Sequence, residues 1–305
     1  MRAFVKPDPA ASFIRSAEVH VPRMGAGELL VRLEAVGVGI HDSYFLPPDA
    51  SYPFPIGIEG AGIVEEVGSG VVEYRPGDRI AFVSSMQPKG GTWAEYAVVD
   101  ARSLILPMPA ELDFVEAAAL PVAGNTVLRA FTALGDMPDG ASIFIAGGSG
   151  AIGTLAIQVA RRRGWRVAAS ASAHNHDYLR SLGAEMPVDY HNSRWPDEIR
   201  RWIPDGVDAA IAVQPGTSDE SMRVVKDGGS VITISGDTVT PERGIRVDMV
   251  AYGKDVRDEL IDLMADVVTK KLHLEIERIY PFDQAAEALS RVQSRHVRGK
   301  LVLRI

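Results

Sequence analysis

Residues 146–164 read AGGSGAIGTLAIQVARRRG and contain the most informative pattern of this chain. Its glycines form a G-x-G-x-x-G pattern that follows the apolar run ASIFIA and precedes a stretch with helical spacing of apolar residues. A pyrophosphate binds well at the first turn of a helix, because free N–H groups and the positive end of the helix dipole meet there. The pattern therefore predicts a strand, a dinucleotide-binding loop and a helix. The residues expected to contact the dinucleotide are Gly148, Ser149, Gly150, Ala151, Ile152 and Gly153.

Each glycine of the pattern has an expected purpose. We expect Gly148 to make a tight turn, Gly150 to let the backbone approach the phosphates, and Gly153 to let the helix pack closely on the strand. Gly164 is expected to end the helix, because glycine adopts the left-handed conformation of a helix C-terminus without steric cost. The alternative is a glycine-rich turn that serves packing alone. The strand and helix patterns on both sides favour dinucleotide binding.

From Ala141 onward, short apolar runs alternate with stretches of helical spacing. The expected helices cover 151–163, 175–182 and 217–226, and the runs between them, such as VDAAIAV and GSVITIS, are apolar on both faces. This alternation is typical of a parallel sheet with helices on both faces. The sequence thus predicts an α/β chain with a doubly wound parallel sheet of Rossmann type.

Residues up to about 110 follow a different pattern. The runs ELLVRLEAVGVG, GIVEEVGSG, DRIAFV and TWAEYAVVD read as strands separated by glycine and proline, which predicts an antiparallel, partly barrel-like domain. A helix pair is expected after Asp113, and the closing run KLVLRI looks like a strand of the first domain. We therefore expect a β-rich domain over 1–115 and 256–305, and a Rossmann domain over 116–255.

The end of the second expected strand of the Rossmann domain lacks an acidic residue. An NAD site usually has one about 20 residues after the glycines, where it accepts hydrogen bonds from the ribose 2′-hydroxyl. Between Thr154 and His176 there is no Asp or Glu. Hydroxyls and imidazoles can donate to a 2′-phosphate that a carboxylate would repel, which favours NADPH. The alternative is a polar turn with solvated histidines. The candidate donors are Ser170, Ser172, His174, His176 and Tyr190.

Length, composition and charge narrow the function classes. The 305 residues fit two domains, and no apolar run reaches the roughly 18 residues of a membrane helix. The net charge of -8, with interspersed charges, argues against a nucleic-acid partner. No secretory signal pattern is present, so a cytoplasmic protein is expected. The chain has no cysteine, which excludes disulfides, thiolate catalysis and cysteine-bound zinc.

Eight pieces of the sequence, in this order, resemble the medium-chain dehydrogenase/reductase superfamily: GIEGAGIVEEVGSGV, RPGDRIAF, GGTWAEYAVV, AAALPVAGNT, GGSGAIGTLAIQVAR, GVDAAIAVQPG, KDGGSVITISG and RGKLVLRI. Within the superfamily, the chain is similar to the zinc-free quinone oxidoreductases related to zeta-crystallin. The resemblance implies a GroES-like catalytic domain built from both chain ends, with a Rossmann domain inserted. It also implies a homodimer that extends the Rossmann sheet, with GIRVDMV as the candidate edge strand.

The resemblance also bears on metal binding. The zinc alcohol dehydrogenases of the superfamily hold zinc through a Cys-His-x-Asp motif, a Gly-His-Glu motif and a later cysteine. At the matching positions this chain has GIHD over 39–42, GIE over 57–59, and Val122. Because the thiolate and imidazole ligands are replaced, we expect no metal site. For His41 and Glu59, which remain, we expect a polar contact and a structural salt bridge or turn.

Further site residues follow from the resemblance. Tyr44 matches a tyrosine that lines the acceptor pocket in this branch, and it could hydrogen-bond an oxyanion that forms on hydride transfer. Asn125 is the second catalytic candidate, with Thr126 beside it. Ser235 and Gly236 are expected to approach the nicotinamide through backbone groups.

The chain also departs from the pattern of the branch. An asparagine usual in the early loop is Gly39, and an arginine usual two residues past the tyrosine is Leu46. A lysine usual after the second Rossmann strand falls at His176, and Lys300 matches a family position that could be structural. These departures leave the natural acceptor open.

The leading hypothesis is a zinc-independent, NADPH-dependent reductase of quinones or α,β-unsaturated carbonyls. Without a Lewis acid, such an enzyme suits acceptors whose conjugation spreads the charge that hydride transfer creates. Two alternatives stay open, namely an enoyl-thioester reductase and a nucleotide-binding protein with little turnover.

Overall fold

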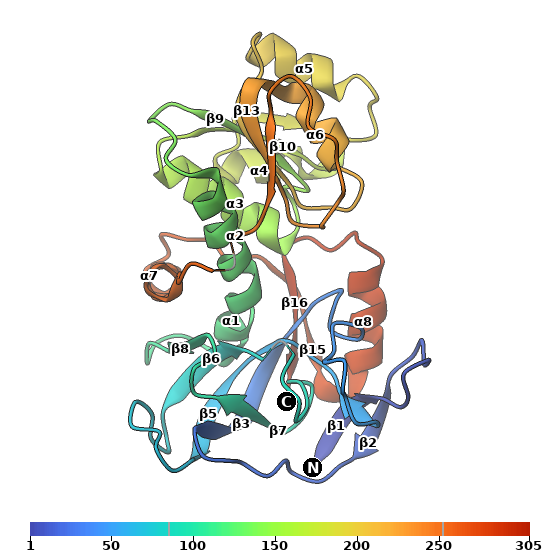
Figure 1. The fold of residues 1–305 in the computed structure, drawn as a ribbon, viewed down its shortest axis with the longest axis vertical. Coiled ribbons are helices and arrows are strands. Elements are labelled where there is room, and N and C mark those ends of the chain that lie inside the picture. The colour runs from blue at the N-terminus through green and yellow to red at the C-terminus, as the bar shows by residue number, and fades with distance from the viewer. Residues whose placement is uncertain (85, 252) are drawn as a thin grey trace. The chain divides into compact units, whose positions relative to one another are not determined.

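The computed structural model describes residues 1–84, 86–251 and 253–305. These form two compact units, drawn in Figure 1. The first contains Met1–Val122 and Arg257–Ile305, and the second contains Ala123–Val256. Each unit has its own sheet and its own hydrophobic core.

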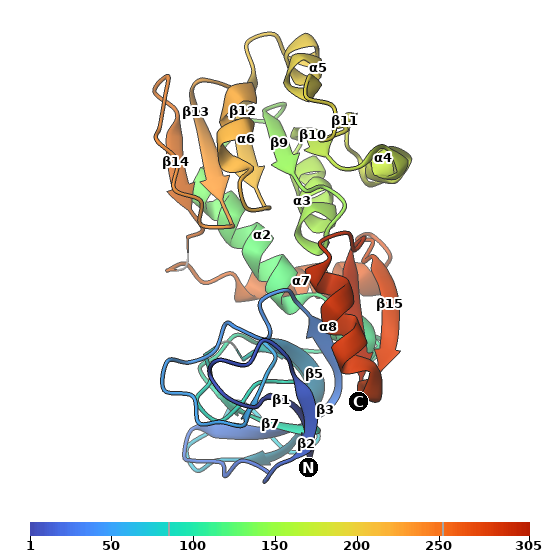
Figure 2. The same ribbon diagram turned by 90° about the vertical axis from the view of Figure 1, so that its right-hand side faces the viewer.

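The second unit is built on a parallel six-stranded sheet with the order β11-β10-β9-β12-β13-β14 (Figure 2). In chain order this is 3-2-1-4-5-6, the strand order of dinucleotide-binding Rossmann domains. The strands are β9 (Ser142–Ala146), β10 (Arg166–Ser170), β11 (Met186–Val188), β12 (Val207–Ala212), β13 (Val225–Thr233) and β14 (Arg246–Met249). All five residues of β9 are buried, as expected for a central strand covered on both faces.

The helices of this unit confirm the periodicity read from the sequence. They are α3 (Ala151–Arg162), η1 (Ala173–Asn175), α4 (His176–Leu182), α5 (Trp195–Trp202), α6 (Ser218–Val224) and the major part of α2 (Pro121–Leu134). Gly164 follows the end of α3 with φ +75°, so the expected glycine stop is confirmed. The helix α5 is an addition, because the sequence interpretation expected only a strand in its neighbourhood.

The first unit has two sheets. A seven-stranded sheet has the order β15-β16-β3-β5-β6-β8, with β7 paired to β3, and a three-stranded sheet has the order β2-β1-β4. Its strands are β1 (Arg2–Lys6), β2 (Arg15–Glu18), β3 (Glu28–Val38), β4 (Phe54–Pro55), β5 (Glu59–Val67), β6 (Arg79–Val83), β7 (Tyr96–Asp100), β8 (Ile105–Pro107), β15 (Ile276–Pro281) and β16 (Lys300–Arg304). Its helices are α1 (Phe114–Ala118), α7 (Arg257–Val268), η2 (Phe282–Gln284) and α8 (Ala285–Gln293).

The two ends of the chain share the seven-stranded sheet. Strand β16 runs antiparallel to β3, with Leu301 opposite Val38 and Arg304 opposite Ala35. Leu301 and Leu303 enter the same core as residues of β3. The expectation that the last strand belongs with the first part of the chain is therefore confirmed. Among the described helices, none combines the length and apolar character that crossing a bilayer requires.

Candidate functional site

The carboxyl edge of the parallel sheet gathers the loops that follow β9, β10, β11, β12 and β13. Parallel strands end at the same edge, and ligands of such sheets bind where the strand order reverses, here between β9 and β12. The loops after these two strands meet, because a Cβ built on Gly147 would lie 3.2 Å from Cγ of Gln214. The glycine stretch therefore lies at the expected switch point of the sheet.

The tight turn of the glycine loop is made by Gly147, which corrects the expectation for Gly148. Gly147 has φ +90°, a left-handed conformation, whereas Gly148 does not. Gly148 is constrained by space instead, since a Cβ there would lie 2.8 Å from Cβ of Ala169 on the neighbouring strand. Gly148, the first glycine of the G-x-G-x-x-G pattern, is thus required for packing against β10. Gly147, which precedes the pattern, makes the turn.

Gly150 and Gly153 lie at the start of α3 in different surroundings. Gly150 is the N-cap with φ -80° and ψ 173°, no side chain caps the helix, and the nearest atom to a built Cβ is 3.8 Å away. The first-turn N–H groups of a helix lack partners within the helix, so this end can receive an anion. At Gly153 a Cβ would collide with the carbonyl oxygen of Gly147.

The candidate donors to a 2′-phosphate occupy three kinds of position. Ser170 is buried beneath the loop, where its Oγ accepts a hydrogen bond of 3.1 Å from Gly147 N–H. Ser172 donates to the hydroxyl oxygen of Tyr190 over 3.1 Å, which leaves the Tyr190 proton as a donor. His176 Nε2 lies 3.3 Å from the carbonyl oxygen of Ala171, and a carbonyl only accepts. Ser172 and Tyr190 are the pair that the fold brings together.

An acid that the sequence interpretation passed over follows the third strand. Asp189 Oδ1 accepts hydrogen bonds from the backbone N–H of His191 over 3.0 Å and lies 2.8 Å from its Nδ1. These hydrogen bonds, with the backbone one largest, hold the pKa of Asp189 below its usual value. The sequence argument about a missing acid considered only the end of the second strand. Because β10 pairs with β11, the residues that follow the third strand lie next to that end as well.

Asp237 is a second acid that the sequence interpretation did not single out. It accepts hydrogen bonds from Gly216 N–H, at 3.1 and 3.0 Å, and from the Ser218 hydroxyl at 2.9 Å. Burial alone would raise the pKa of Asp237, but these donors outweigh it and the pKa is lowered. Asp237 thereby ties the β12–α6 loop to the segment with Ser235 and Gly236. The signal in the sequence is that aspartate and serine side chains often hydrogen-bond to the backbone in loops.

Asn125 and Thr126 lie on α2, and both are half-buried. Arg129, one turn further along, donates from Nε to Asn125 Oδ1 over 2.6 Å and from a terminal nitrogen to the carbonyl oxygen of Ala251 over 3.2 Å. The Asn125 carboxamide oxygen is therefore engaged, and its NH₂ group is the part suited to donate to a ligand.

Tyr44 lies in the first unit, on a turn just after β3. Its N–H donates to the carbonyl oxygen of His41, and the two rings meet edge to face with centroids 5.3 Å apart. Tyr44 is 55% exposed and Phe45 47% exposed, so two adjacent aromatic rings face solvent. Exposed aromatic clusters often mark ligand contacts.

Next to this turn lies a buried cluster of three ionisable residues, Asp42, Glu59 and Lys300, which are 2%, 2% and 6% exposed. Lys300 Nζ forms a short ion pair with Glu59 Oε1, while Glu59 Oε2 accepts a 2.7 Å hydrogen bond from Val122 N–H in the first turn of α2. The structural salt bridge expected for Glu59 is therefore confirmed, and its partner is Lys300.

Asp42 holds the turn from inside. Its Oδ2 accepts a 2.7 Å hydrogen bond from Gly39 N–H. Burial raises the pKa of Asp42 to about 7, against the opposing charge of Lys300 and with a further contribution from Glu59. A carboxyl group that is half protonated near neutrality is unusual in a structural position.

Within the described residues, no group of three or more histidine, aspartate or glutamate side chains is arranged to hold a metal ion. The pKa of His41 is lowered by burial and by the positive charges of Arg295 and Lys300. Both oxygens of Glu59 are already engaged. The surviving members of the zinc motifs thus serve the ion cluster and the turn.

A model of the alcohol dehydrogenase GroES-like domain matches residues 25–110, and a model of zinc-binding dehydrogenases matches residues 182–303. An NADPH-dependent alkenal/one oxidoreductase of Arabidopsis thaliana is 30% identical, over 99% of this chain and 79% of the relative. The chain belongs to the medium-chain dehydrogenase/reductase superfamily. It falls within the branch of quinone and enone oxidoreductases.

Two further relatives agree with this family assignment. A 2-methylene-furan-3-one reductase of Solanum lycopersicum is 29% identical, over 94% of this chain and 74% of the relative. The quinone oxidoreductase structure from Coxiella burnetii matches with a TM-score of 0.87 and 27% identity, covering 100% of this chain and 99% of that one. This member of the superfamily is an oxidoreductase that uses a nicotinamide cofactor.

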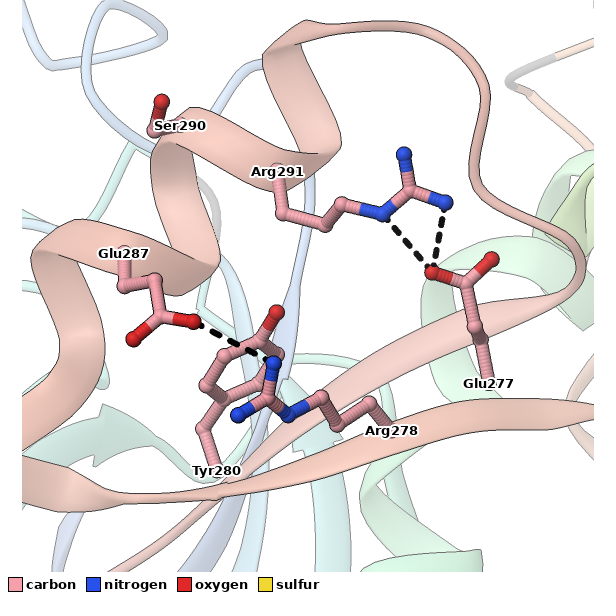
Figure 3. Close-up of a pocket in the computed structure, with 6 residues that line it drawn as sticks. All are labelled: Glu277, Arg278, Tyr280, Glu287, Ser290 and Arg291. Atoms are coloured by element: carbon pink, nitrogen blue, oxygen red, sulfur yellow. Dashed lines mark hydrogen bonds and ion pairs between the residues drawn. The ribbon is translucent and has the colours of Figure 1, made fainter.

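A hollow on the surface of the first unit lies between β15 and α8 (Figure 3). Ion pairs cross it, from Arg278 to Glu287 over 3.2 Å and from Arg291 to Glu277 over 2.8 Å, and the Arg278 guanidinium lies over the Tyr280 ring. The arginines and glutamates that line the hollow form ion pairs with one another, and these pairs connect α8 to β15. We therefore do not assign the hollow as a site of hydride transfer.

Proposed function

We propose that this protein reduces α,β-unsaturated carbonyl compounds or quinones with NADPH and without zinc. The observation that carries the proposal is the open start of α3, where Gly150 leaves space for a phosphate beside a second-strand end that has hydroxyls in place of an acid. The names of the Arabidopsis, tomato and Coxiella relatives support the same chemistry.

The cofactor would be held by the second unit. The first-turn N–H groups of α3 would bind the pyrophosphate, and Tyr190, oriented by Ser172, would donate to the 2′-phosphate. Ser170 would support the loop, and His176 would contribute through its position at the start of α4. The full set of proposed cofactor contacts is Thr126, Gly148, Ser149, Gly150, Ala151, Ile152, Gly153, Ser170, Ser172, His176, Tyr190, Ser235 and Gly236.

The proposed catalytic residues are Tyr44 and Asn125, and each carries a group that can donate a hydrogen bond to an acceptor. NADPH, when bound, supplies the hydride. As the hydride bonds to the β-carbon of an enone, the electron pair of the C=C bond moves so that charge accumulates on the carbonyl oxygen. Tyr44 would donate a hydrogen bond to that oxygen, and a proton from solvent would complete the saturated ketone. The net change is NADPH, enone and one proton converted to NADP⁺ and ketone.

The absence of a zinc requirement rests on the donor set. Gly39, Ile58 and Val122 occupy the places of the usual ligands and offer no side-chain donors for zinc. Glu59 is committed to Lys300 and to Val122 N–H.

The test is the initial rate of NADPH and NADH oxidation with a small benzoquinone and an alkyl enone, with EDTA present throughout. We expect turnover that EDTA does not reduce and that is faster with NADPH. Tight NADPH binding without turnover of either acceptor would overturn the proposal. Loss of activity in EDTA, restored by zinc, would overturn its metal-free part.

The basis of the NADPH preference can be tested by Ser172→Asp, with Ser172→Asn as the matched control of similar size. A carboxylate at this position would repel a 2′-phosphate and accept hydrogen bonds from a ribose 2′-hydroxyl. We expect the aspartate variant to shift the ratio of kcat/KM for NADPH over NADH toward NADH by about tenfold or more, and the asparagine variant to shift it much less. Equal ratios in the two variants would exclude Ser172 from the 2′-phosphate site.

We further propose functional domains over 1–115 with 256–305 and over 116–255, and a cytoplasmic homodimer. Strand β14 lies at one edge of the six-stranded sheet and Met249 on it is 58% exposed, which supports pairing of this edge with a second copy. Light scattering of the purified protein, with Val247→Pro as an edge-breaking variant, tests this assembly.

A further inference from the structure

Asp189, the residue after β11, brings a negative charge to the edge of the sheet where the 2′-phosphate donors lie. Strands β10 and β11 are neighbours (Figure 2), and Ala171 N–H donates to the carbonyl oxygen of Val188 over 3.0 Å. Tyr190, next to Asp189, contacts Ser172 through the 3.1 Å hydrogen bond between their hydroxyls. A free carboxylate beside this pair would repel a 2′-phosphate and favour a ribose 2′-hydroxyl.

His191 forms an ion pair with this carboxylate when its ring is protonated. Its backbone N–H donates to Asp189 Oδ1 over 3.0 Å, and its Nδ1 lies 2.8 Å from the same oxygen. Because the pKa of Asp189 is lowered, chiefly by the backbone hydrogen bond, the carboxyl group is ionised and can only accept. Nδ1 therefore carries a proton, and Nε2 is the nitrogen that gains one when the ring becomes charged. The His191 side chain is 61% exposed, so protons from solvent reach it.

The His191 ring is held on a second side by Tyr190. The two ring centroids are 4.1 Å apart, and the ring planes are inclined by 31°. The hydroxyl of the same tyrosine contacts Ser172. A charge on His191 therefore arises next to the acid and next to the tyrosine that is the proposed phosphate donor.

The segments around the ends of β10 and β11 contain no permanently charged cation. Residues 168–178 and 186–193 include no lysine or arginine, but they include His174, His176 and His191. Histidine is the residue whose charge ordinarily changes between pH 5 and 8. Any positive charge that these two segments offer to a phosphate therefore depends on pH.

Other charged groups near His191 belong to α4, to α5 and to the segment before α5. His176 begins α4, and its charge acts on Asp189. Glu198 of α5 accepts a 2.8 Å hydrogen bond from the side chain of the residue after His191. Arg194 is the N-cap residue of α5. Because His176 is a second imidazole in this region, a test of His191 has to change that residue alone.

We propose that Asp189 and His191 together set the preference between NADPH and NADH, and that they do so in a pH-dependent way. This rests on the proposed function, in which the second unit binds NADPH. With His191 protonated, the charges of the pair cancel, and the 2′ position can receive a phosphate. With His191 neutral, the pair keeps the negative charge of Asp189, which opposes a 2′-phosphate. The preference for NADPH therefore falls as the pH rises.

The first test measures the Kd values of NADPH and NADH from their fluorescence, in phosphate-free buffer of constant ionic strength. The preference is the Kd for NADH divided by the Kd for NADPH. Between pH 6.0 and pH 8.5 we expect it to fall about two- to fivefold more in the wild type than in His191→Gln, the effect of an exposed charge pair. His191→Gln is the reference because the 2′-phosphate itself titrates at about pH 6. An equal change in both proteins would overturn the proposal.

The second test removes the acid. Asp189→Asn carries no charge at this position, so at pH 8.5 it should prefer NADPH about two- to fivefold more strongly than the wild type does. The matched control is Asp205→Asn, an exposed acid just before β12 and so at the opposite edge of the sheet. It should keep the wild-type preference at both pH values. A wild-type preference in Asp189→Asn at pH 8.5 would overturn the proposal.

Binding measurements keep this proposal distinct from the proposed function. Tight NADPH binding without reduction of any acceptor would overturn the proposed function, while the pH-dependent preference could still be measured. A wild type that reduces enones with NADPH, but whose preference does not depend on His191, would overturn the role of Asp189 and His191 alone. A wild type that binds neither cofactor would overturn both.

Discussion

The glycine loop of the second unit and the turn around Tyr44 in the first unit differ in the kind of atoms that they offer a ligand. The glycine loop between β9 and α3 is made of backbone, and its exact residues are set by what a side chain would strike, as at Gly148 and Gly153. The turn around Tyr44 presents side chains, next to a buried cluster of Asp42, Glu59 and Lys300. A site made of backbone groups consists of consecutive residues, whereas a site made of side chains can combine residues that are far apart in the sequence.

This difference predicts different responses to substitution. Residues of the buried ion cluster depend on one another, because removing one charge leaves another unpaired in a medium of low dielectric. Residues of the glycine loop depend on the space around them, so each substitution acts through one steric contact. Four predictions test this contrast.

The largest effect is expected from Lys300→Met. It removes the only cation among the three buried residues and leaves Glu59 without its ion-pair partner. We expect a loss of about 3–5 kcal/mol in the free energy of unfolding, measured by urea denaturation. The control is Lys226→Met, whose partner Asp208 is 31% exposed, and which should cost about 1 kcal/mol or less. Equal losses would mean that burial of the pair does not matter.

Asp42→Asn should change how stability depends on pH. The folded protein holds the Asp42 proton up to a pKa of about 7, against 3.8 in the unfolded chain, so wild-type stability from this group falls as the pH rises from about 4 to about 7. Asparagine does not titrate. The stability of the variant relative to the wild type should therefore increase over that interval, by roughly 2–4 kcal/mol, and stay level above it.

Urea denaturation of both proteins at pH 5 and pH 8 measures this change. A difference in stability that is the same at the two pH values would show that Asp42 is ionised in the folded protein throughout. Asp42, Glu59 and Lys300 would then all be charged in the folded protein, so the buried cluster would differ even more in charge from the glycine loop.

Gly153→Ala and Gly150→Ala separate packing from ligand approach in the glycine loop. The first places a methyl group against the carbonyl oxygen of Gly147 and should lower the free energy of unfolding by about 1–3 kcal/mol. The second has open space around its Cβ and should leave the melting temperature nearly unchanged while weakening NADPH binding. Melting curves and NADPH fluorescence titrations measure the two effects. A stable Gly153→Ala would contradict the steric account.

Tyr190→Phe should have the smallest effect. It removes the hydroxyl that Ser172 contacts over 3.1 Å, at a cost of about 0.5–1.5 kcal/mol in binding, which raises the KM for NADPH several-fold. The KM for NADH serves as the internal control and should be unchanged, since NADH has no 2′-phosphate. Parallel increases for both cofactors would place Tyr190 elsewhere than at the 2′ position.

The doubly wound unit and the location of its glycine loop could be predicted from the order of the residues alone. Strands β9, β10, β12 and β13 and helices α3, α4 and α6 all follow from apolar periodicity and from glycines at their ends, which are properties of neighbouring residues. The sequence also indicated that the closing strand returns to the first unit, because its alternation and composition match those of the early strands. The structural salt bridge of Glu59 was expected, but not its partner.

The contacts between residues far apart in the chain could not be predicted from the sequence and became visible in the folded structure. Lys300 and Glu59 are 241 positions apart, and they meet because β16 and β5 both pair with β3. The structure also assigned the tight turn to Gly147 and placed Asp189 and Asp237 at the carboxyl edge of the sheet. Local periodicity reports which residues form an element, whereas the pairing of elements depends on how whole faces pack, and that information is spread over the entire chain.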